Sequence, residues 1–356
     1  MQTCAKPAAS AQAGACRQMV KRASIKDIAR LAGVSHSTVS RALRGSPLIS
    51  AETARRIRAL AEEAGYRPSA AARSLVTSRT ATLGVVVTTI ADPFAAEAVL
   101  GIEDATLEHG YSVLLANSNA EPERELKVVR SFEERRVDGI IVTSSRVGAA
   151  YVDSLSRARV PIVLLNNQHP SEFLHSVMID NFDASLALTR HLIELGHRRI
   201  AYIGDRYGRQ SDTERFGGYR AALDFACLPF LPEYVVHGDG KPEGGARALE
   251  TLLQLPTPPT AVFCYNDMTA LGALCAAARK GLRVPLDLSV AGFDDLFFAP
   301  YCTPPLTTVR QPVRQMGRMA VQTLLKLLAG ESAAHIIRIP GELILRESTA
   351  PPKENV

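Results

Sequence analysis

A short stretch between Ser35 and Arg44 is rich in side chains that form hydrogen bonds. Hydroxyl groups, one imidazole and two guanidinium groups follow one another there, with few apolar residues between them. Small hydroxyls can approach base edges and phosphate oxygens of DNA, and a longer cation beside them can pair with phosphate or guanine. The stretch therefore predicts a DNA-reading surface. We assign to it Ser35, His36, Ser37, Thr38, Ser40, Arg41 and Arg44.

Two short helices joined by a tight turn are expected to position these side chains. Ser24 followed by Asp27 indicates a capping box at the start of the first helix, and Gly33 supplies the backbone freedom that ends it. In the second helix Val39 and Leu43 are four residues apart and point toward the core, so the polar residues occupy the opposite face.

Further apolar positions complete a small helical core. Ile28 and Leu31 are expected to lie on one buried face of the first helix. A third helix is predicted from an N-cap at Ser50, through Ile57, to Gly65. The pattern therefore predicts a three-helix domain that contains a helix-turn-helix.

Charge separates this interpretation from an ordinary helical hairpin, which the bare pattern would also fit. Residues 21–79 contain twelve Lys and Arg against four acids, a net charge of +8. Lys6 and Arg17 add two positive charges, and the whole chain carries +5, so residues 80–356 carry −5. A basic module joined to an acidic domain is the electrostatic pattern of a protein that binds the phosphate backbone.

Several short motifs resemble the LacI/GalR family of bacterial transcriptional repressors. They are KDIARLAGVS at 26–35, TVSR at 38–41, GYRP at 65–68 and ARSL at 72–75, and the similarity extends from about residue 21 to 347. The resemblance implies a regulator that binds near-palindromic operator DNA as a homodimer. It also implies a small effector that controls the affinity for DNA.

The element pattern and the resemblance together predict five segments. They are a disordered N-terminal extension over 1–20, a helix-turn-helix domain over 21–68, a hinge helix and linker over 69–82, an effector-binding and dimerisation domain over 83–347, and a tail over 348–356. The resemblance implies that the hinge helix orders on DNA, with Arg73 among its contacts and Leu75 inserted into the minor groove. Without the family, the simplest interpretation of Leu75 is packing on the larger domain.

From residue 83 onward, short β-branched runs alternate with helical patterns, which predicts parallel, doubly wound α/β sheets. Strands are predicted at 83–87, 112–116, 139–142, 162–165, 177–179, 200–203, 261–264, 289–292 and 307–309. Helices are predicted at 95–109, 123–136, 184–195, 213–226, 245–253, 267–280 and 313–329. The resemblance implies two lobes of the periplasmic-binding-protein type, 83–181 plus 311–347 and 182–310, hinged around a cleft.

Polar residues cluster where predicted strands end, and ligands of such sheets bind at the carboxyl ends of the strands. Carried over residue by residue, the resemblance assigns Arg215, Asn266 and Asp294 to the effector. Asp92, Phe94, Arg209 and Ser211 match positions that vary between family members. Carboxylate and guanidinium groups can bond neighbouring hydroxyls bidentately, which favours a sugar or sugar acid. Asp267 is interpreted as the capping carboxylate of the following helix.

One departure from the family affects the choice of effector. Several relatives place an aromatic residue in the segment after a strand at 235–236, whereas this chain reads GDGKP at 238–242 and contains no Trp. Stacking on a ligand would have to come from Phe94, Tyr207, Phe297 or Phe298, each of which is more simply explained by packing. A purine or another metabolite acting as corepressor therefore remains the alternative to an inducing sugar.

Other classes of protein fit the sequence less well. An enzyme is disfavoured because no nucleotide loop, nucleophile elbow or metal-ligand cluster is present, so we expect no catalytic residue, metal or cofactor. A transport solute-binding protein would share the α/β fold, but the basic module and the lack of a signal sequence argue against it. Six cysteines without metal spacing fit the cytoplasm, and no apolar run approaches a membrane span. The tail lacks leucine heptads, which predicts a dimer and not a tetramer.

Overall fold

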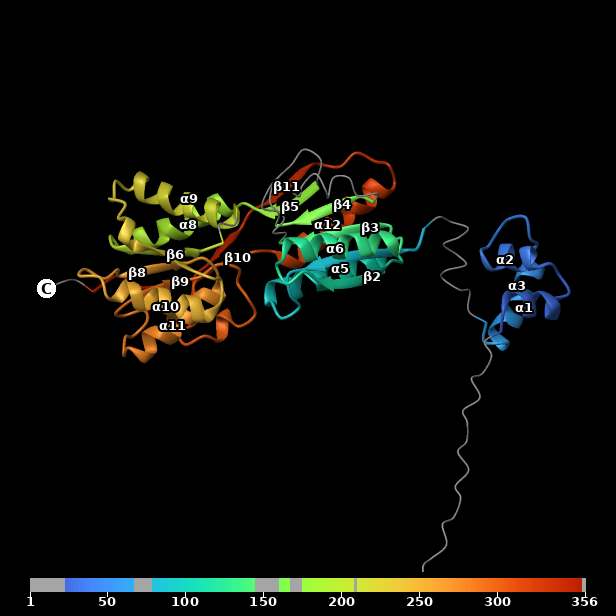
Figure 1. The fold of residues 1–356 in the computed structure, drawn as a ribbon, viewed down its shortest axis with the longest axis horizontal. Coiled ribbons are helices and arrows are strands. Elements are labelled where there is room, and N and C mark those ends of the chain that lie inside the picture. The colour runs from blue at the N-terminus through green and yellow to red at the C-terminus, as the bar shows by residue number, and fades with distance from the viewer. Residues whose placement is uncertain (1–22, 67–78, 145–159, 167–174, 208–209, 354–356) are drawn as a thin grey trace, which may run out of the picture. The chain divides into compact units, whose positions relative to one another are not determined.

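The computed structural model describes residues 23–66, 79–144, 160–166, 175–207 and 210–353. The chain divides into two compact units, Met1–Ser78 and Arg79–Val356. The first unit is helical, and the second contains two parallel sheets (Figure 1). Arg73, Leu75 and Arg209 lie outside the described residues, as do the predicted N-terminal extension and most of the predicted hinge.

Three capped helices build the described part of the first unit. They are α1 (Ile25–Ala32), α2 (His36–Leu43) and α3 (Ala51–Glu63). Ser24, Ser35 and Ser50 cap the three N-termini, and the capping box of Ser24 with Asp27 is present. Gly33 ends α1 with φ 64°, in the left-handed region where a residue without Cβ is not strained. The predicted caps and turn are therefore confirmed.

The core of this unit is small and apolar. Ile28, Val39 and Ile57 are fully buried where the three helices meet. The expectation for Leu31 is wrong, because its side chain is 59% exposed while Ala32 is buried. The positions four residues apart face α2 and α3, and Leu31, three residues after Ile28, lies at the edge of that narrow face.

The larger sheet of the second unit has six parallel strands in the order β11-β5-β4-β3-β1-β2. Its strands are β1 (Thr82–Val87), β2 (Ser112–Asn117), β3 (Gly139–Thr143), β4 (Ile162–Leu165), β5 (His175–Ile179) and β11 (Ile336–Ile339). Helices α5 (Pro93–Glu108) and α12 (Val313–Leu328) pack on one face, and α6 (Pro122–Glu134) packs on the other. Both faces of the central strands are buried, which explains their continuous β-branched runs.

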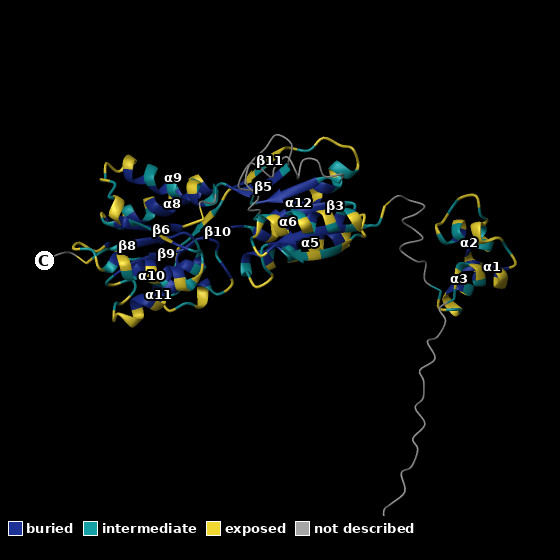
Figure 2. Ribbon diagram, in the orientation of Figure 1, coloured by how far each residue is buried: buried dark blue, intermediate teal, exposed yellow. Residues whose placement is uncertain are grey.

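The smaller sheet has four parallel strands in the order β7-β6-β8-β9. These are β6 (Ile200–Asp205), β7 (Val235–Gly238), β8 (Ala261–Cys264) and β9 (Ser289–Ala291). Helices α8 (Asn181–Glu194) and α9 (Gln210–Phe225) cover one face, and α10 (Pro242–Leu253) and α11 (Asp267–Arg279) cover the other (Figure 1). Figure 2 shows buried strands between helices whose outer faces are exposed.

Three segments connect the two sheets. Residues 180–181 lead from β5 into α8, residues 311–312 lead from β10 (Thr308–Arg310) into α12, and residues 340–341 lead from β11 into β12 (Glu342–Ile344). Strands β10 and β12 pair with each other in antiparallel orientation. The backbone N–H of Asp180 also donates to the carbonyl of Ile339 at 2.8 Å, so the first and third crossings are bonded together.

The predicted fold class is confirmed, and the differences are local. Strands β11 and β12 are absent from the prediction because each is three or four residues long and half exposed, which leaves little periodic signal. Helices α5, α6 and α10 begin earlier than predicted, at Pro93, Pro122 and Pro242, because proline is well suited to a first helical position. The segment and lobe boundaries remain predictions.

A test for membrane-spanning segments gives a negative result within the described residues. No helix there combines the length and the apolar character that crossing a bilayer requires.

Candidate functional site

Helix α2 presents the side chains that were assigned to DNA. His36, Ser37 and Arg41 are exposed on its outer face. Ser35 stabilises the start of the helix. Its hydroxyl accepts from the backbone N–H of Thr38 at 3.1 Å and also bonds the Thr38 hydroxyl at 2.9 Å. Fewer polar groups of this helix are therefore available for DNA than the sequence predicts.

The far end of α2 is also held locally. Arg44 is the C-cap residue, and its Nε donates to the carbonyl of Ser40 at 3.1 Å. From α3, Arg56 donates to the carbonyl of Ala32 at the end of α1, at 2.8 Å. Guanidinium groups at helix C-termini satisfy carbonyls that lack an intrahelical partner, so part of the positive charge of this unit stabilises its fold.

The strongest cluster in the second unit surrounds Arg215, which is only 3% exposed. Its Nε donates to Asn181 Oδ1 at 2.9 Å, and its Nη1 donates to the carbonyl of Tyr265 at 2.5 Å. The guanidinium carbon lies 3.7 Å from the centroid of the Phe293 ring. Only Nη2 faces Asp294, with an Nη2 to Oδ1 distance of 3.6 Å, which exceeds a direct hydrogen bond.

Asp294 and Asp295 follow β9 in an unusual backbone conformation. Their φ angles are 118° and 54°, and non-glycine residues in this region are strained and concentrate at functional sites. The side chain of Asp294 accepts from Gln311 Nε2 at 2.6 Å. Asp295 instead accepts from Arg310 at 2.8 Å and Arg346 at 2.6 Å. Asp295 thus forms ion pairs with two arginines, while Asp294 faces Arg215.

The capping role predicted for Asp267 is wrong, and Asn266, predicted to contact the effector, has structural contacts of its own. Asn266 is the N-cap of α11: its Oδ1 accepts from the Thr269 backbone at 2.8 Å, and its Nδ2 donates to the Gly240 carbonyl at 3.1 Å. Asp267 does not cap the helix. Its carboxylate points into the protein, where it accepts from the Leu296 backbone at 2.8 Å. Burial, followed by the negative charge of Asp294, raises the pKa of Asp267 well above its usual value.

The remaining predicted effector residues fall into two groups. Ser211 is bonded through its hydroxyl to Tyr265 OH at 2.9 Å, which brings it to the residue that also accepts from Arg215. Asp92 caps α5 by accepting from the backbone N–H of Phe94 at 3.1 Å, and Phe94 is buried in the core of the larger lobe. The contacts of Asp92 and Phe94 shown here hold the start of α5.

The packing explanation of the candidate aromatic residues holds for some of them only. Phe94 is buried and Phe298 is partly buried, as packing predicts. The expectation is wrong for Tyr207 and Phe297, which are 50% and 69% exposed. Both residues lie beyond the ends of strands, outside the sheet.

Sequence reasoning missed two side chains of the Arg215 cluster, Asn181 and Gln311. Both are less than 5% exposed, and each bonds directly to one member of the Arg215–Asp294 pair. A signal was present, because each polar residue directly follows a strand or lies one residue beyond it. The rule that ligands bind at the carboxyl ends of strands would have selected both residues.

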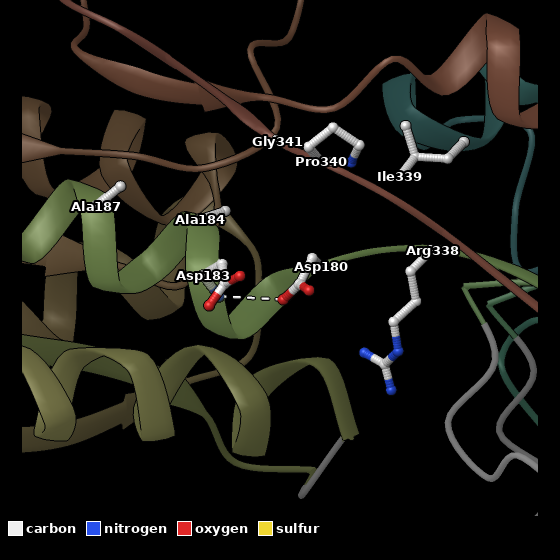
Figure 3. Close-up of a pocket in the computed structure, with 8 residues that line it drawn as sticks. All are labelled: Asp180, Asp183, Ala184, Ala187, Arg338, Ile339, Pro340 and Gly341. Atoms are coloured by element: carbon white, nitrogen blue, oxygen red, sulfur yellow. Dashed lines mark hydrogen bonds between the residues drawn. The ribbon is translucent and has the colours of Figure 1, made fainter.

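A separate pocket of about 240 Å³ lies beside the third crossing segment. Figure 3 shows Asp180 and Asp183 at the start of α8, with Arg338, Pro340 and Gly341 on the opposite side. Asp180 caps α8 by accepting from the backbone of Asp183 at 3.1 Å. Arg338 approaches Glu214 at 3.7 Å. These charged groups already serve the helix and the crossing, so this pocket is a weaker candidate than the Arg215 cluster.

Metal coordination has no visible site in the described ranges. No group of three or more His, Cys, Asp or Glu side chains is arranged there to hold an ion.

Two family models match the chain. Residues 24–69 match the model of bacterial regulatory proteins of the lacI family, and residues 189–349 match a periplasmic binding protein-like domain. The first range covers the three helices, and the second covers most of the smaller lobe together with α12, β11 and β12.

Relatives match over nearly the whole chain. The HTH-type transcriptional repressor CytR of Escherichia coli (strain K12) is 38% identical over 328 residues, 92% of this chain and 96% of that protein. The HTH-type transcriptional repressor PurR of Actinobacillus pleuropneumoniae serotype 3 (strain JL03) is 33% identical over 329 residues, 92% of this chain and 98% of that protein.

Solved structures agree with this likeness. A lac repressor dimer bound to operator and the anti-inducer ONPF is similar with a TM-score of 0.85 and 28% identity, covering 93% of this chain and all of that chain. A complex of the transcriptional regulator CelR with cellobiose has a TM-score of 0.71 and 32% identity, covering 92% of this chain and all of that chain. A LacI family regulator from Enterococcus faecium with bound ribose has a TM-score of 0.67 and 29% identity, covering 76% and 99%.

Proposed function

Because the chain belongs to the LacI family and is a transcriptional repressor with an effector-binding domain, we propose that a small sugar-like ligand controls its affinity for operator DNA. The observation that carries this proposal is the buried Arg215–Asp294 pair, whose 3.6 Å separation is longer than a hydrogen bond. A pair of neighbouring hydroxyls can bond to both groups at once. Two similar regulators have been solved with cellobiose and with ribose, which supports this class of ligand.

We propose Arg215 and Asp294 as the main effector contacts, with Ser211 beside them. Asn266 keeps a place in the proposal, although its amide group already caps α11 and bonds Gly240. Asp92, Phe94 and Arg209 remain predictions that rest on the family resemblance.

For the DNA, we propose that His36, Ser37 and Arg41 make the direct contacts of α2, since these three are exposed on its outer face. Ser35, Thr38, Ser40 and Arg44 shape the helix ends and approach phosphates. Arg73 and Leu75 remain sequence-based predictions for the hinge.

We further propose a homodimer on a near-palindromic operator, because paired reading helices impose their two-fold symmetry on the DNA. Large apolar side chains at Leu107, Phe297 and Tyr301 are 75%, 69% and 82% exposed in the single chain, as expected of surfaces that a second copy covers. The relatives are transcriptional repressors, which supports a binding protein and not an enzyme. A repressor acts where the DNA is, which supports the predicted cytoplasmic location.

The effector must act by binding two lobe arrangements with different affinity, because a ligand with equal affinity for both shifts nothing. We favour induction, in which the ligand stabilises the arrangement that binds operator weakly.

A thermal-shift screen of sugars, sugar acids and purines tests the proposal. We expect a sugar or sugar acid to raise the melting temperature of the parent protein and to leave that of Asp294→Ala unchanged, because the carboxylate partner is gone. Asp224→Ala, an exposed substitution on α9, is the matched control and should keep the full shift. Asp294→Ala should also retain DNA binding and lose its response to the ligand.

Two results would contradict the proposal. A shift with purines alone would overturn the sugar class, and an undiminished ligand response in Asp294→Ala would overturn the assignment of the site.

A further inference from the structure

The two side chains that hold the Arg215–Asp294 pair come from two different crossing segments. Asn181 lies at the first crossing and accepts from Arg215 Nε at 2.9 Å. Gln311 lies at the second crossing and donates to Asp294 Oδ1 at 2.6 Å. Each member of the pair is thus hydrogen-bonded by a residue that belongs to a connection between the lobes.

Each of these side chains also has a second polar partner. Asn181 Nδ2 donates to Glu214 Oε2 at 3.0 Å, and the other oxygen of Glu214 lies 3.7 Å from Arg338 Nη1. Arg338 is the second-last residue of β11, the strand that leads into the third crossing, and it lines the pocket of Figure 3. The set thereby includes residues of the first two crossings and of the strand that leads into the third.

The other end of the set reaches the larger lobe. Asn166 follows β4, and its Nδ2 lies 3.5 Å from Gln311 Oε1, at the limit of a hydrogen bond. A polar path therefore runs from the end of β4, through Gln311, Asp294, Arg215, Asn181 and Glu214, to Arg338 of β11.

Burial makes these contacts sensitive to displacement. The four central side chains are Asn181, Arg215, Asp294 and Gln311, and they are 2%, 3%, 8% and 4% exposed. A buried polar group that loses its partner bears the full cost of desolvation, and a buried charge that loses its partner costs more. When one member moves, its neighbours must therefore move with it or lose their bonds.

We infer that Asn181 and Gln311 are positioning residues of the effector site, which hold Arg215 and Asp294 in place and pass their displacement to the crossing segments. A ligand hydroxyl that bonds both groups from beside the pair, whose atoms lie 3.6 Å apart, competes with Asn181 and Gln311 and displaces the two crossing segments. The inference deepens the proposed effector site and rests on it. The experiments that test this inference need no ligand. Their failure would therefore not affect the sugar proposal, and failure of the sugar proposal would not affect their result.

The first experiment uses Gln311→Glu, which places a carboxylate against Asp294. Asp294 contacts this position directly, and Arg215 and Asp267 are charged neighbours of Asp294. Two carboxylates in hydrogen-bond contact share a proton, so one pKa rises above its unfolded value. The folded variant is then stabilised at low pH, where this proton is bound, and it loses that stability as the pH rises. We expect the melting temperature of Gln311→Glu to approach the parent value near pH 5 and to fall about 2–4 °C below it by pH 8.

The matched control is Gln322→Glu, the same substitution at an exposed position of α12. It should show no such divergence with pH. An offset of Gln311→Glu that does not vary with pH, or one equal to the control, would overturn the assignment of Gln311.

The second experiment measures hydrogen exchange in the full-length protein. We expect Asn181→Ala to accelerate exchange in peptides covering 309–313, and Gln311→Ala to accelerate it in peptides covering 179–183. The increase should be about three- to tenfold, the effect of one lost hydrogen bond. The acceleration in the double variant should be only slightly larger than that in the more affected single variant, because both substitutions interrupt the same set of hydrogen bonds.

Gln322→Ala serves as the control and should change neither segment. Acceleration confined to the neighbourhood of each substitution, or spread evenly over the lobe, would overturn the inference.

Discussion

Exposure and hydrogen bonding together distinguish the polar residues at the start of α2. The Ser35 hydroxyl caps the helix at the Thr38 backbone and also bonds the hydroxyls of Ser37 and Thr38. Thr38 is half-buried, whereas His36 and Ser37 are exposed on the first turn. Position along the sequence does not separate these residues, since all four are consecutive and polar. Base preference is therefore expected to reside in His36 and Ser37.

Replacing His36 or Ser37 with Ala is predicted to change which operator sequence is preferred. These side chains lie on the first exposed turn of α2, and each altered base contact typically changes binding by about 1–3 kcal/mol. Selection from a random DNA pool, followed by competition binding, measures the effect. Ser112→Ala, at an exposed position of β2, is the control. An unchanged consensus in both α2 variants would show that another element reads the bases.

Neighbouring helices of the second unit approach closely through glycine. A Cβ at Gly272 of α11 would overlap the carbonyl oxygen of Pro242, at the start of α10. A Cβ at Gly101 of α5 would likewise overlap the carbonyl of Arg314 in α12. Both clashes are with backbone, which cannot rotate away as a side chain can. These contacts fix the helix layers against which the strands pack.

Gly272→Ala is predicted to destabilise the protein by about 1–3 kcal/mol, because the added methyl forces α10 and α11 apart. Urea denaturation measures the loss. At Gly217 the added methyl would meet only ring carbons of Phe182, the nearest at 3.3 Å, so Gly217→Ala is the milder control. Equal effects of the two substitutions would contradict the close-packing argument.

The segment that follows β12 closes the edge of the smaller sheet. Ser348 is fully buried, and its carbonyl accepts from the backbone N–H of Val290 at 2.9 Å. His197, 1% exposed, bonds the Ala350 carbonyl through Nε2 at 2.9 Å and Thr260 Oγ1 through Nδ1 at 2.9 Å. A carbonyl only accepts, so Nε2 carries a proton.

Stability is predicted to fall as pH drops from about 6.5 to about 4, because burial lowers the pKa of His197 to about 4 from a usual 6.5. As the pH falls, the unfolded chain binds this proton before the folded protein does. The loss of stability therefore begins near the pKa of the unfolded chain and is complete below the pKa of the folded protein. The contribution of His197 is roughly 2–3 kcal/mol. His191, whose pKa burial also lowers, acts in the same direction.

Denaturation across this pH range isolates the contribution of His197. The free energy of unfolding of His197→Gln should depend less on pH than that of the parent. His237→Gln, at an exposed position of β7, should behave like the parent. Parallel pH profiles for parent and His197→Gln would contradict the assignment.

At the scale of the whole molecule, a basic helical unit is joined to a two-lobed unit that carries the effector site. Regulation requires that a ligand in the second unit changes how the first binds DNA, and such coupling is a difference in ligand affinity between two states. The two sheets are connected at the three crossings, so we expect any relative motion of the lobes to occur there. The aromatic residues near η2 (Ala299–Tyr301) are exposed, and we propose that a second copy binds there.

Sedimentation is predicted to show a dimer, and Tyr301→Glu is predicted to weaken it. A charge in an apolar interface is desolvated without a partner, which costs several kcal/mol. Phe225→Glu, at a position of α9 that is 77% exposed, is the control and should leave the dimer intact. A stable tetramer would refute the prediction drawn from the tail, and an unaffected dimer in Tyr301→Glu would place the interface elsewhere.

Local chemistry in the sequence was sufficient for the features that depend on neighbours in the chain. Ser24 and Asp27 bond across three residues, Gly33 ends a helix by its own φ, and buried strands show as β-branched runs. The fold class follows from their alternation. Arg215 and Asp294 were selected through the family resemblance, which indicates the positions of site residues but not the contacts that these residues make.

Only the tertiary structure decided which distant residues meet. Asn181 and Gln311 are separated from their partners in the sequence, so no local pattern joins them to Arg215 and Asp294. The exposure of Leu31 depends on how far α2 and α3 reach across α1. The choice of Asn266 over Asp267 as the cap depends on what lies beneath α11, because a buried carboxylate needs donors that come from other segments of the chain.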